Sequence, residues 1–493
     1  MRAGGAARNT LFALLTQIST AVFTAGLTIF LVRELGPTEF GLFSLAVSIG
    51  GLVLLPSDFG ITGSAARFVA ERRDDPDSVA SLLSSALRLK LAISGVVSVV
   101  MILLAAPIAE AYGEPSLTWP IRWLAIAVLA QGLVSFYRYQ FNALRNASVG
   151  LKIVLGESAV ECTASVVLVV AAGGAAAAAA GRAAGYVFGA LLAIGITVRE
   201  LGPRVLRRSR RLGEARRSLA RYAGALFLIE TAFAASVQVA PLLIGAFLGP
   251  REVGLFQAPS RLLVVVQYPA IAISQGVAPR MARTEDNEPD VATYSAALRF
   301  LVVWHALMVV PLLVWAHPIV DLVLGAEYAK SAEILQIWAP YIFVAGIANV
   351  LAVGLNYLGE ARRRLPVSVL EVGLTLGLTV VAVQTVGLTG AAVVSDIVSV
   401  LFVVLMLRIL TGIIDLPLRS LGVSFLRALL AAAAMAAVLL PFGTGPGDLA
   451  LWEWFAGLAG GTIAFAAVLL ATREVTPAEL RELRARVRRR RGS

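Results

Sequence analysis

Long apolar runs separated by short polar connections dominate this chain. A helix needs about twenty mainly apolar residues to cross the hydrocarbon core of a bilayer, and fourteen runs are predicted as such spans. They lie at about residues 10–32, 40–62, 83–110, 117–141, 149–172, 174–198, 218–247, 253–278, 294–324, 332–358, 365–386, 388–410, 420–441 and 449–471. This pattern predicts an all-α integral membrane protein.

A nine-residue segment recurs after a fixed interval. Leu35–Phe43 reads LGPTEFGLF, and Leu248–Phe256 reads LGPREVGLF, 213 positions later (252 − 39). Proline lacks an N–H and disfavours helical geometry in the residue before it, so each copy predicts a tight connection between two helices. Other matches keep shifts from 211 (318 − 107) to 216 (390 − 174). Chance similarity between apolar segments is the alternative, but the near-constant shift favours a duplicated unit.

The duplication predicts the domain organisation. Each copy contains six spans, an even number, so both copies enter the membrane with the same polarity and should be related by a pseudo-twofold axis along the membrane normal. The predicted parts are an N-terminal six-helix bundle at 1–198, a basic cytoplasmic linker at 199–217, a C-terminal six-helix bundle at 218–412, two further transmembrane helices at 413–472 and a basic cytoplasmic tail at 473–493.

Positive charge is concentrated on alternate connections between the predicted spans. The loop after the sixth span carries nine arginines between residues 199 and 221, and the tail ends in four consecutive arginines at 488–491. Because cytoplasmic loops are enriched in Lys and Arg, this alternation predicts that both termini are cytoplasmic in a multi-pass protein of the cell membrane. The tail is expected to contact anionic lipid, with nucleic acid the weaker alternative.

Composition agrees with a membrane protein and excludes several kinds of site. The chain is 58% hydrophobic and 15% charged, with a mean hydropathy of +0.82, whereas a soluble domain is about half apolar and a quarter charged. Its net charge of +11 follows from the cytoplasmic loops, so we expect no nucleic-acid partner. With Cys162 alone and two histidines, a Cys/His zinc cluster is excluded.

Enzymatic motifs are missing from the sequence. There is no GxxxxGK[ST] phosphate loop and no GxSxG nucleophile turn. The short connections leave no room for a glycosyltransferase or ligase site. We therefore expect a protein that is not an enzyme, with no catalytic residue, no cofactor and no metal.

Ionisable residues within the spans are the candidate binding residues, because charge is costly in lipid and usually faces an interior cavity. They are Asp58, Glu157, Glu161, Arg182, Glu230, Arg261, Glu371 and Asp396. Arg182 either pairs with Glu157 or Glu161 to fix helix packing, or lines a cationic cavity between the two halves. For Arg261 we favour the cavity, and for Asp58 a structural role at a helix end is an equal alternative. Glu371 follows Glu157 by 214 positions (371 − 157), as the duplication predicts.

Several segments resemble one family of transporters. Leu31–Pro37 reads LVRELGP, Ser57–Ile61 reads SDFGI and Leu324–Tyr328 reads LGAEY. With Glu39-Phe40-Gly41, these segments are similar to the polysaccharide flippases of bacteria and archaea, in the multidrug/oligosaccharidyl-lipid/polysaccharide exporter superfamily. The resemblance implies two six-helix bundles in a V around a central cavity. It also implies outward transfer of a polyprenyl-linked oligosaccharide whose diphosphate meets positive residues.

The resemblance also implies partners and leaves alternatives open. We expect a monomer that meets membrane lipids and works beside glycosyltransferases or a polysaccharide polymerase. The alternatives are a cation-coupled drug or small-molecule exporter of the same superfamily, or a non-transporting scaffold for polysaccharide synthesis. A peptidoglycan-precursor flippase is a close variant of the favoured function. Fourteen spans and arginines within them favour the flippase, since such drug exporters more often have twelve spans and acidic cavities.

Overall fold

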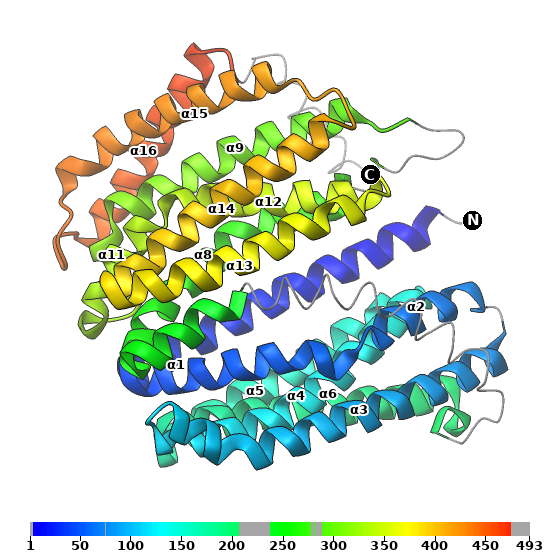
Figure 1. Ribbon diagram of the computed structural model, residues 1–493. Helices are drawn as coiled ribbons and strands as arrows, with labels where there is room; N and C mark the ends of the chain where they lie inside the picture. Colours follow the sequence, from blue (N-terminus) through cyan, green and yellow to red (C-terminus); the bar gives the residue numbers. More distant parts are fainter. Residues whose placement is uncertain (1–2, 74, 207–236, 278–280, 282–287, 475–493) are drawn as a thin grey trace. The chain divides into compact units, whose positions relative to one another are not determined.

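The computed structural model describes the chain except residues 1–2, 74, 207–236, 278–280, 282–287 and 475–493 (Figure 1). Every regular element in the described residues is a helix, and eleven helical stretches there are long and apolar enough to cross a membrane. The predicted all-α membrane fold is confirmed. Most of the predicted basic linker and basic tail lies outside the described residues.

The chain forms two compact units, residues 1–258 with 372–391 and residues 259–371 with 392–493. The first helices in chain order are α1 (Ala3–Asp58), α2 (Ile61–Glu71), α3 (Pro76–Ala111), α4 (Thr118–Ala143), α5 (Ala147–Ala172) and α6 (Gly174–Leu201). A short apolar helix, Val237–Leu248, precedes α8 (Pro250–Val277) and α9 (Val291–Val314). The remaining helices are α10 (Ala316–Val323), α11 (Ala329–Ile337), α12 (Ala339–Tyr357), α13 (Ala361–Thr385), α14 (Leu388–Thr411), α15 (Leu418–Leu439) and α16 (Leu451–Ala471).

The first two predicted spans join in α1, without a loop between them. The backbone leaves helical geometry only at Gly36, where φ is 66° and ψ is 175°. This left-handed φ suits glycine, and the following proline can begin the next helical turn. The predicted tight connection is therefore a kink. The second span then ends at Asp58, because Phe59 and Gly60 both have positive φ, and α2 continues beyond them.

Two other predicted spans are broken. The prediction of one span over 294–324 is wrong at Trp315, where α9 ends and the short α10 begins. The predicted span at 332–358 is divided at Trp338, which separates α11 from α12 and is followed by Pro340 in the first turn. Apolar side chains continue through both breaks, so hydropathy alone does not reveal them.

The two copies of the repeated segment contact each other within the first unit. A Cβ added to Gly41 would lie 1.8 Å from the carbonyl oxygen of Pro250. Reciprocally, a Cβ added to Gly254 would lie 1.9 Å from the carbonyl oxygen of Pro37. Gly41 corresponds to Gly254 and Pro37 to Pro250 at the 213-residue shift, so equivalent residues exchange places across this contact, as in an isologous interface. Only glycine permits this approach of backbone to backbone.

Small residues bring α5 and α6 together in the first unit. Gly181, Gly185 and Gly189 recur every four residues and so form a stripe on one face of α6. A Cβ added at Gly181 or Gly185 would lie 2.4 Å from an atom of Ser165 or Glu161 on α5. This close packing through small residues is typical of membrane helices. It fixes the position of the acidic side chains of α5.

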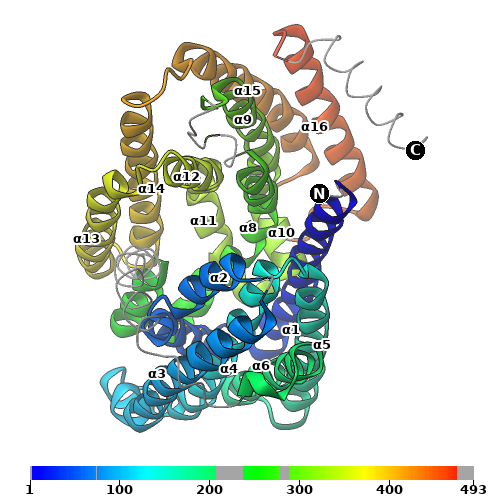
Figure 2. The same ribbon diagram turned by 90° about the vertical axis from the view of Figure 1, so that its right-hand side faces the viewer.

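The core of the second unit forms around α9, and it includes α15 and α16, the two helices outside the predicted duplication. Figure 2 shows α15 beside α9 and α16, in agreement with the contacts between these helices. Trp315, fully buried, donates from Nε1 to the carbonyl oxygen of Leu439 at 3.3 Å. Its ring meets that of Trp454 edge to face, with centroids 5.2 Å apart. The additional helices are therefore part of this unit's packed core.

Candidate functional site

Arg182 lies among α5 and α6 side chains, in the first unit. Its Nη1 donates to Glu161 Oε1 at 3.1 Å, and its Nη2 donates to the Tyr186 hydroxyl at 3.3 Å. The guanidinium carbon lies 5.2 Å from the centre of the Tyr186 ring, within range of a cation–π interaction. The structure thus brings Arg182 to Glu161, the second of the two acids predicted as its partners. The arginine side chain as a whole is 25% exposed.

Glu157 lies one helical turn before Glu161 and has a different environment. Its residue is only 8% exposed, and it packs against Gly189 of α6. Within the part of the chain that the structure describes, its Oε2 has no hydrogen-bond partner. A buried carboxyl oxygen without a donor costs about 1–3 kcal/mol or more. The two acids are therefore unequal, one held by arginine and one left with an unsatisfied oxygen.

Asp58 forms an ion pair that the sequence analysis missed. Lys90 on α3 donates from Nζ to Asp58 Oδ1, and the lysine side chain is only 1% exposed. Thr62 also contacts this carboxylate, through its hydroxyl and through its backbone N–H at 3.3 Å. The available signal was a lysine within the apolar run 83–110. Buried lysines are rare unless paired, so a lysine in this run indicates an acid nearby.

Polar side chains around this pair hold the break after α1. Ser94 of α3 donates to the carbonyl oxygen of Ser57 at 2.9 Å. Gln140 of α4 donates from Nε2 to the carbonyl oxygen of Thr62 at 3.2 Å. The first bond satisfies a carbonyl in the last turn of α1, where the helix is interrupted, and the second ties the first turn of α2 to α4. The geometry around Asp58 therefore fits the structural helix-end role.

The predicted acids of the second unit, Asp396 and Glu371, lie on different helices. Asp396 of α14 accepts from the backbone N–H of Tyr341 at 2.9 Å and so caps the first turn of α12. Glu371 is half-buried on α13, and Arg261 is half-buried on α8. Glu230 lies outside the described residues. The structure thus gives Asp396 a capping contact, and it places Arg261 and Arg182 in different units.

The glutamate of the first repeated segment also caps a helix. Glu39 Oε2 accepts from the backbone N–H of Ala175 at 2.7 Å, at the start of α6. A carboxylate at a helix N-terminus satisfies a free N–H and interacts favourably with the helix dipole. Among the described residues, no group of three or more His, Cys, Asp or Glu side chains is placed to hold a metal ion.

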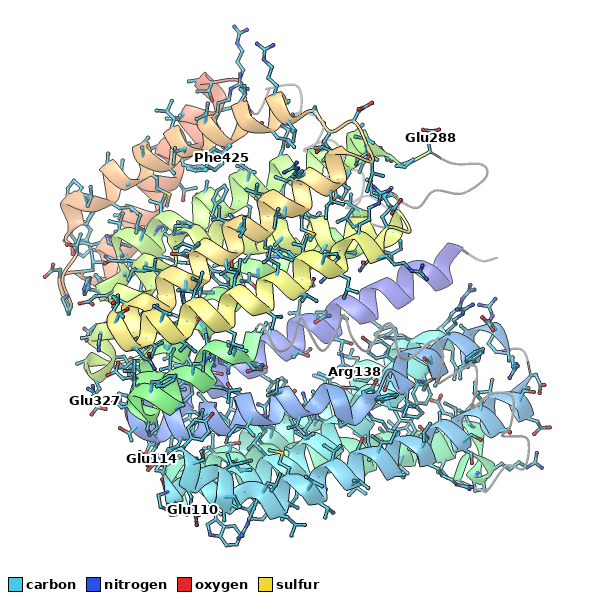
Figure 3. The ribbon with its side chains drawn as sticks, viewed as in Figure 1. Glu110, Glu114, Arg138, Glu288, Glu327 and Phe425 are labelled. Atoms are coloured by element: carbon cyan, nitrogen blue, oxygen red, sulfur yellow. The ribbon has the colours of Figure 1, made fainter. Side chains whose placement is uncertain are left out.

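Three charged residues of the first unit lie toward opposite ends of its helices. Glu110, near the end of α3, and Glu114, before α4, lie toward one end of this unit, and Arg138 of α4 lies toward the other (Figure 3). This agrees with the alternation of charge between predicted connections, in which the loop after α3 is poor in Arg and Lys.

Comparison with known proteins gives consistent matches. The family described as polysaccharide biosynthesis protein matches residues 6–285. A protein of Haloferax volcanii named probable low-salt glycan biosynthesis flippase Agl15 is 23% identical over 91% of this chain and 93% of its own length. A putative O-antigen transporter of Escherichia coli is 22% identical over 70% of this chain and 82% of its own.

Solved structures show the same fold. The lipid II flippase MurJ, in an inward closed conformation, superposes with a TM-score of 0.76 at 12% identity and covers 93% of this chain and 98% of its own. An inward-facing multidrug resistance transporter of the MATE family superposes with a TM-score of 0.66 at 14% identity, covering 81% of this chain and 94% of its own.

Proposed function

We propose a transport function for this chain, which belongs to the polysaccharide biosynthesis protein family and is a polysaccharide flippase of the multidrug/oligosaccharidyl-lipid/polysaccharide exporter superfamily. The proposed substrate is a polyprenyl-diphosphate-linked oligosaccharide, which the protein moves across the cell membrane. The transfer runs from the cytoplasmic to the outer leaflet and supplies cell-surface polysaccharide biosynthesis. The relatives named as a glycan flippase and an O-antigen transporter support this substrate class.

The observation that carries the proposal is the arrangement of Arg182, Glu161 and Tyr186. Arginine keeps its charge at any physiological pH and presents a planar fork that matches phosphate oxygens. Glu161 and the Tyr186 ring hold this fork in one orientation. A substrate diphosphate competes with Glu161 for the guanidinium, so binding loosens one charge pair as it forms another. The exchange keeps the arginine paired in both states.

Transport proceeds by alternating access in this proposal. The two predicted bundles, residues 1–198 and 218–412, rock about a central cavity that opens to each side in turn. Arg182 on the first bundle and Arg261 on the second hold the anionic head group. Both termini are cytoplasmic, as the alternation of positive charge predicts.

The protein acts by binding and conformational change in this proposal, with no bond made or broken in the substrate. It works as a monomer beside the glycosyltransferases or polymerase that make and consume its substrate. No observation on this chain specifically favours the drug-exporter alternative, since the match to multidrug transporters at 14% identity shows the fold alone.

Complementation with surface polysaccharide as readout tests the proposal, with membrane abundance measured in parallel. Arg182→Gln and Arg261→Gln should each lower export about tenfold or more, since a hydrogen bond to a charged group contributes about 1.5–3 kcal/mol. Arg182→Lys should restore export only in part, because lysine keeps the charge and loses the fork.

Arg204→Gln is the matched control. Arg204 pairs with Asp77 at 3.1 Å, but both side chains are more than 70% exposed, so this pair contributes little. Its loss should leave export unchanged. Full export by both Arg182→Gln and Arg261→Gln at normal abundance would refute the cationic-cavity mechanism and would fit the non-transporting scaffold.

A further inference from the structure

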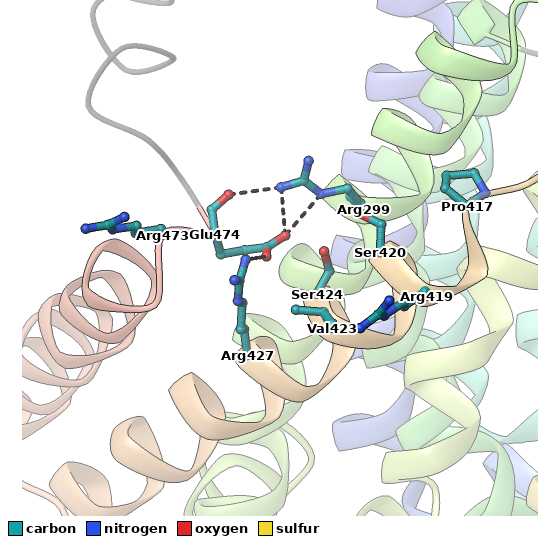
Figure 4. Close-up of a pocket in the computed structure, with 9 residues that line it drawn as sticks. All are labelled: Arg299, Pro417, Arg419, Ser420, Val423, Ser424, Arg427, Arg473 and Glu474. Carbon is teal, nitrogen blue, oxygen red and sulfur yellow. Dashed lines mark hydrogen bonds and ion pairs between the residues drawn. The ribbon is translucent and has the colours of Figure 1, made fainter.

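A pocket of about 640 Å³ opens in the second unit, where the ends of α9, α15 and α16 meet (Figure 4). Its volume falls within the range of about 300–1,000 Å³ that is typical of small-molecule sites. The charged side chains that line it are Arg299, Arg419, Arg427, Arg473 and Glu474. None of these residues was assigned a role by the sequence analysis or by the proposed transport mechanism.

Glu474 is held firmly in this pocket. Arg299 donates from Nε at 3.1 Å and from Nη2 at 3.0 Å to its Oε1, and Arg427 donates from Nη1 at 3.0 Å to its Oε2 (Figure 4). The glutamate side chain is 2% exposed, whereas each arginine is about one-third exposed. One carboxylate therefore fixes two arginines from different helices, while about one-third of each arginine side chain stays exposed.

The turn that positions Glu474 in the pocket contains an arginine in a left-handed conformation. Arg473 has a φ of 57°. Its N–H donates to the carbonyl oxygen of Leu470 at 3.1 Å, and the Glu474 N–H donates to that of Leu469 at 2.9 Å. This is a Schellman turn, whose left-handed position usually holds glycine. An arginine there costs about 1–2 kcal/mol of backbone energy relative to a right-handed conformation. The chain thus keeps a cation at a position where glycine would be the more stable residue.

The pocket carries an excess of positive charge. Four arginines face one glutamate, which gives a net charge of +3 (4 − 1). In the region that the structure describes, neither Arg419 nor Arg473 forms an ion pair, and both are exposed. Four arginines around one opening favour the binding of an anion with several oxygen acceptors. A phosphate ester is the chemical group that fits this description.

An apolar stripe continues from the pocket along α15. Val423, Leu426 and Leu430 follow Arg419 at intervals of four, three and four residues, so they share one face of the helix. Their side chains are exposed, with Leu426 at 64% and Leu430 at 57%. Since α15 is apolar enough to span the bilayer, this exposed apolar face suits contact with lipid acyl chains beside the pocket.

We propose that this pocket binds the phosphate of an anionic phospholipid, with the acyl chains lying along the stripe of Val423, Leu426 and Leu430. The lipid belongs to the cytoplasmic leaflet in the orientation proposed above. It is a component of the membrane itself, bound at a site composed only of second-unit residues. Arg299 and Arg427 form the inner wall of the site, and Arg419 and Arg473 supply the unpaired charge.

Lipid binding by the purified full-length protein in neutral detergent tests this inference. The thermal unfolding midpoint is measured against increasing mole fractions of phosphatidylglycerol, of phosphatidylcholine and, separately, against inorganic phosphate. Phosphatidylglycerol should raise the midpoint saturably, and the other two should have little effect. Both faces of the protein are accessible in detergent, so the result depends neither on orientation nor on transport.

The pocket variant combines Arg419→Gln with Arg473→Gly, since glycine suits the left-handed turn and keeps Glu474 in place. The control variant combines Arg362→Gln with Arg408→Gln, which removes the same charge from exposed positions elsewhere in this unit. An arginine near anionic lipid contributes about fivefold in affinity, so the pocket variant should need roughly thirtyfold more phosphatidylglycerol for half saturation.

The control variant should respond like the wild type. Equal responses of the pocket and control variants would overturn the proposal. Stabilisation by inorganic phosphate equal to that by phosphatidylglycerol would also overturn it, because the pocket would then take a soluble phosphate compound.

Discussion

Gly41→Ala should destabilise the protein although alanine is the better helix former. The added methyl would lie 1.8 Å from the carbonyl oxygen of Pro250 and 2.6 Å from its carbonyl carbon. Ordinary contact begins at 3.4 Å, so the two backbones must separate locally by 1.6 Å (3.4 − 1.8). A side chain could rotate away, but the atom in the way belongs to the backbone of α8.

The magnitude follows from two opposing effects. Overpacking a close contact costs about 1–3 kcal/mol, and the upper end applies because backbone atoms cannot yield. Replacing a helical glycine by alanine raises the free energy of unfolding by about 1 kcal/mol, because alanine is the better helix former. The net destabilisation is therefore about 2 kcal/mol. Gly254→Ala should cost the same, because a Cβ there would lie 1.9 Å from Pro37 O in the reciprocal contact.

The double variant separates this explanation from a general loss of stability. Once Gly41→Ala has moved the backbones apart, Gly254→Ala meets a contact that is already open. The loss in free energy of unfolding in the double variant should therefore be well below the sum of the losses in the two single variants. Gly26→Ala on α1 is the control, since no atom lies within 4 Å of its added Cβ, and it should gain about 0.5–1 kcal/mol. Thermal unfolding in detergent measures all four variants. A stable Gly41→Ala, or strict additivity, would refute the reciprocal contact.

Three further outcomes are expected. Lys90→Met should lower the free energy of unfolding by about 3 kcal/mol because Asp58 loses its buried partner, and adding Asp58→Asn should recover part of the loss in thermal unfolding; no loss would contradict the pair. Burial raises the pKa of Glu474, but hydrogen bonds from Ser424 and its two arginines outweigh it and lower the pKa below the ordinary 4.5. Glu474→Gln should therefore cost about 2 kcal/mol at pH 7. Its difference from wild type in thermal midpoint should begin to shrink as the pH falls below 4.5 and should vanish as the pH passes through the lowered pKa. In a cysteine-free background, a membrane-impermeant reagent should label a cysteine at position 116 from outside and fail at 493, and external labelling at 493 would refute the orientation.

Hydropathy and charge were sufficient to predict the class of fold. Each of the fourteen predicted spans has a helical counterpart, although the first part of the seventh lies outside the described residues. The breaks at Trp315 and Trp338 were not predicted, because the apolar pattern continues through them and no proline or glycine occupies the breaking residue. The kink at Gly36 was predicted as a connection, because Gly-Pro interrupts a helix wherever it occurs.

The candidate site could be predicted only in part, because it depends on contacts between residues that are far apart in the sequence. The sequence gives Arg182 two possible partners, Glu157 and Glu161, since both acids lie on the preceding span, and only the structure selects Glu161. Lys90 was missed because its partner lies on another helix, and spacing along the chain does not reveal which helices are neighbours. Glu474 was missed for a different reason. Its position depends on a left-handed turn at Arg473, and the sequence has no glycine there to indicate such a turn.

The Asp58–Lys90 pair has a consequence for how the protein is made. During synthesis the span that carries Asp58 leaves the ribosome before the span that carries Lys90, 32 residues later (90 − 58). A lone lysine in the middle of a helix costs about 2.5–3.5 kcal/mol on entering the membrane through the translocon. The charge is neutralised only when both segments are present, so α3 should enter the lipid together with the end of α1 as a hairpin. Nascent chains that stop short of Lys90 should leave the second span poorly anchored and exposed to membrane quality-control proteases.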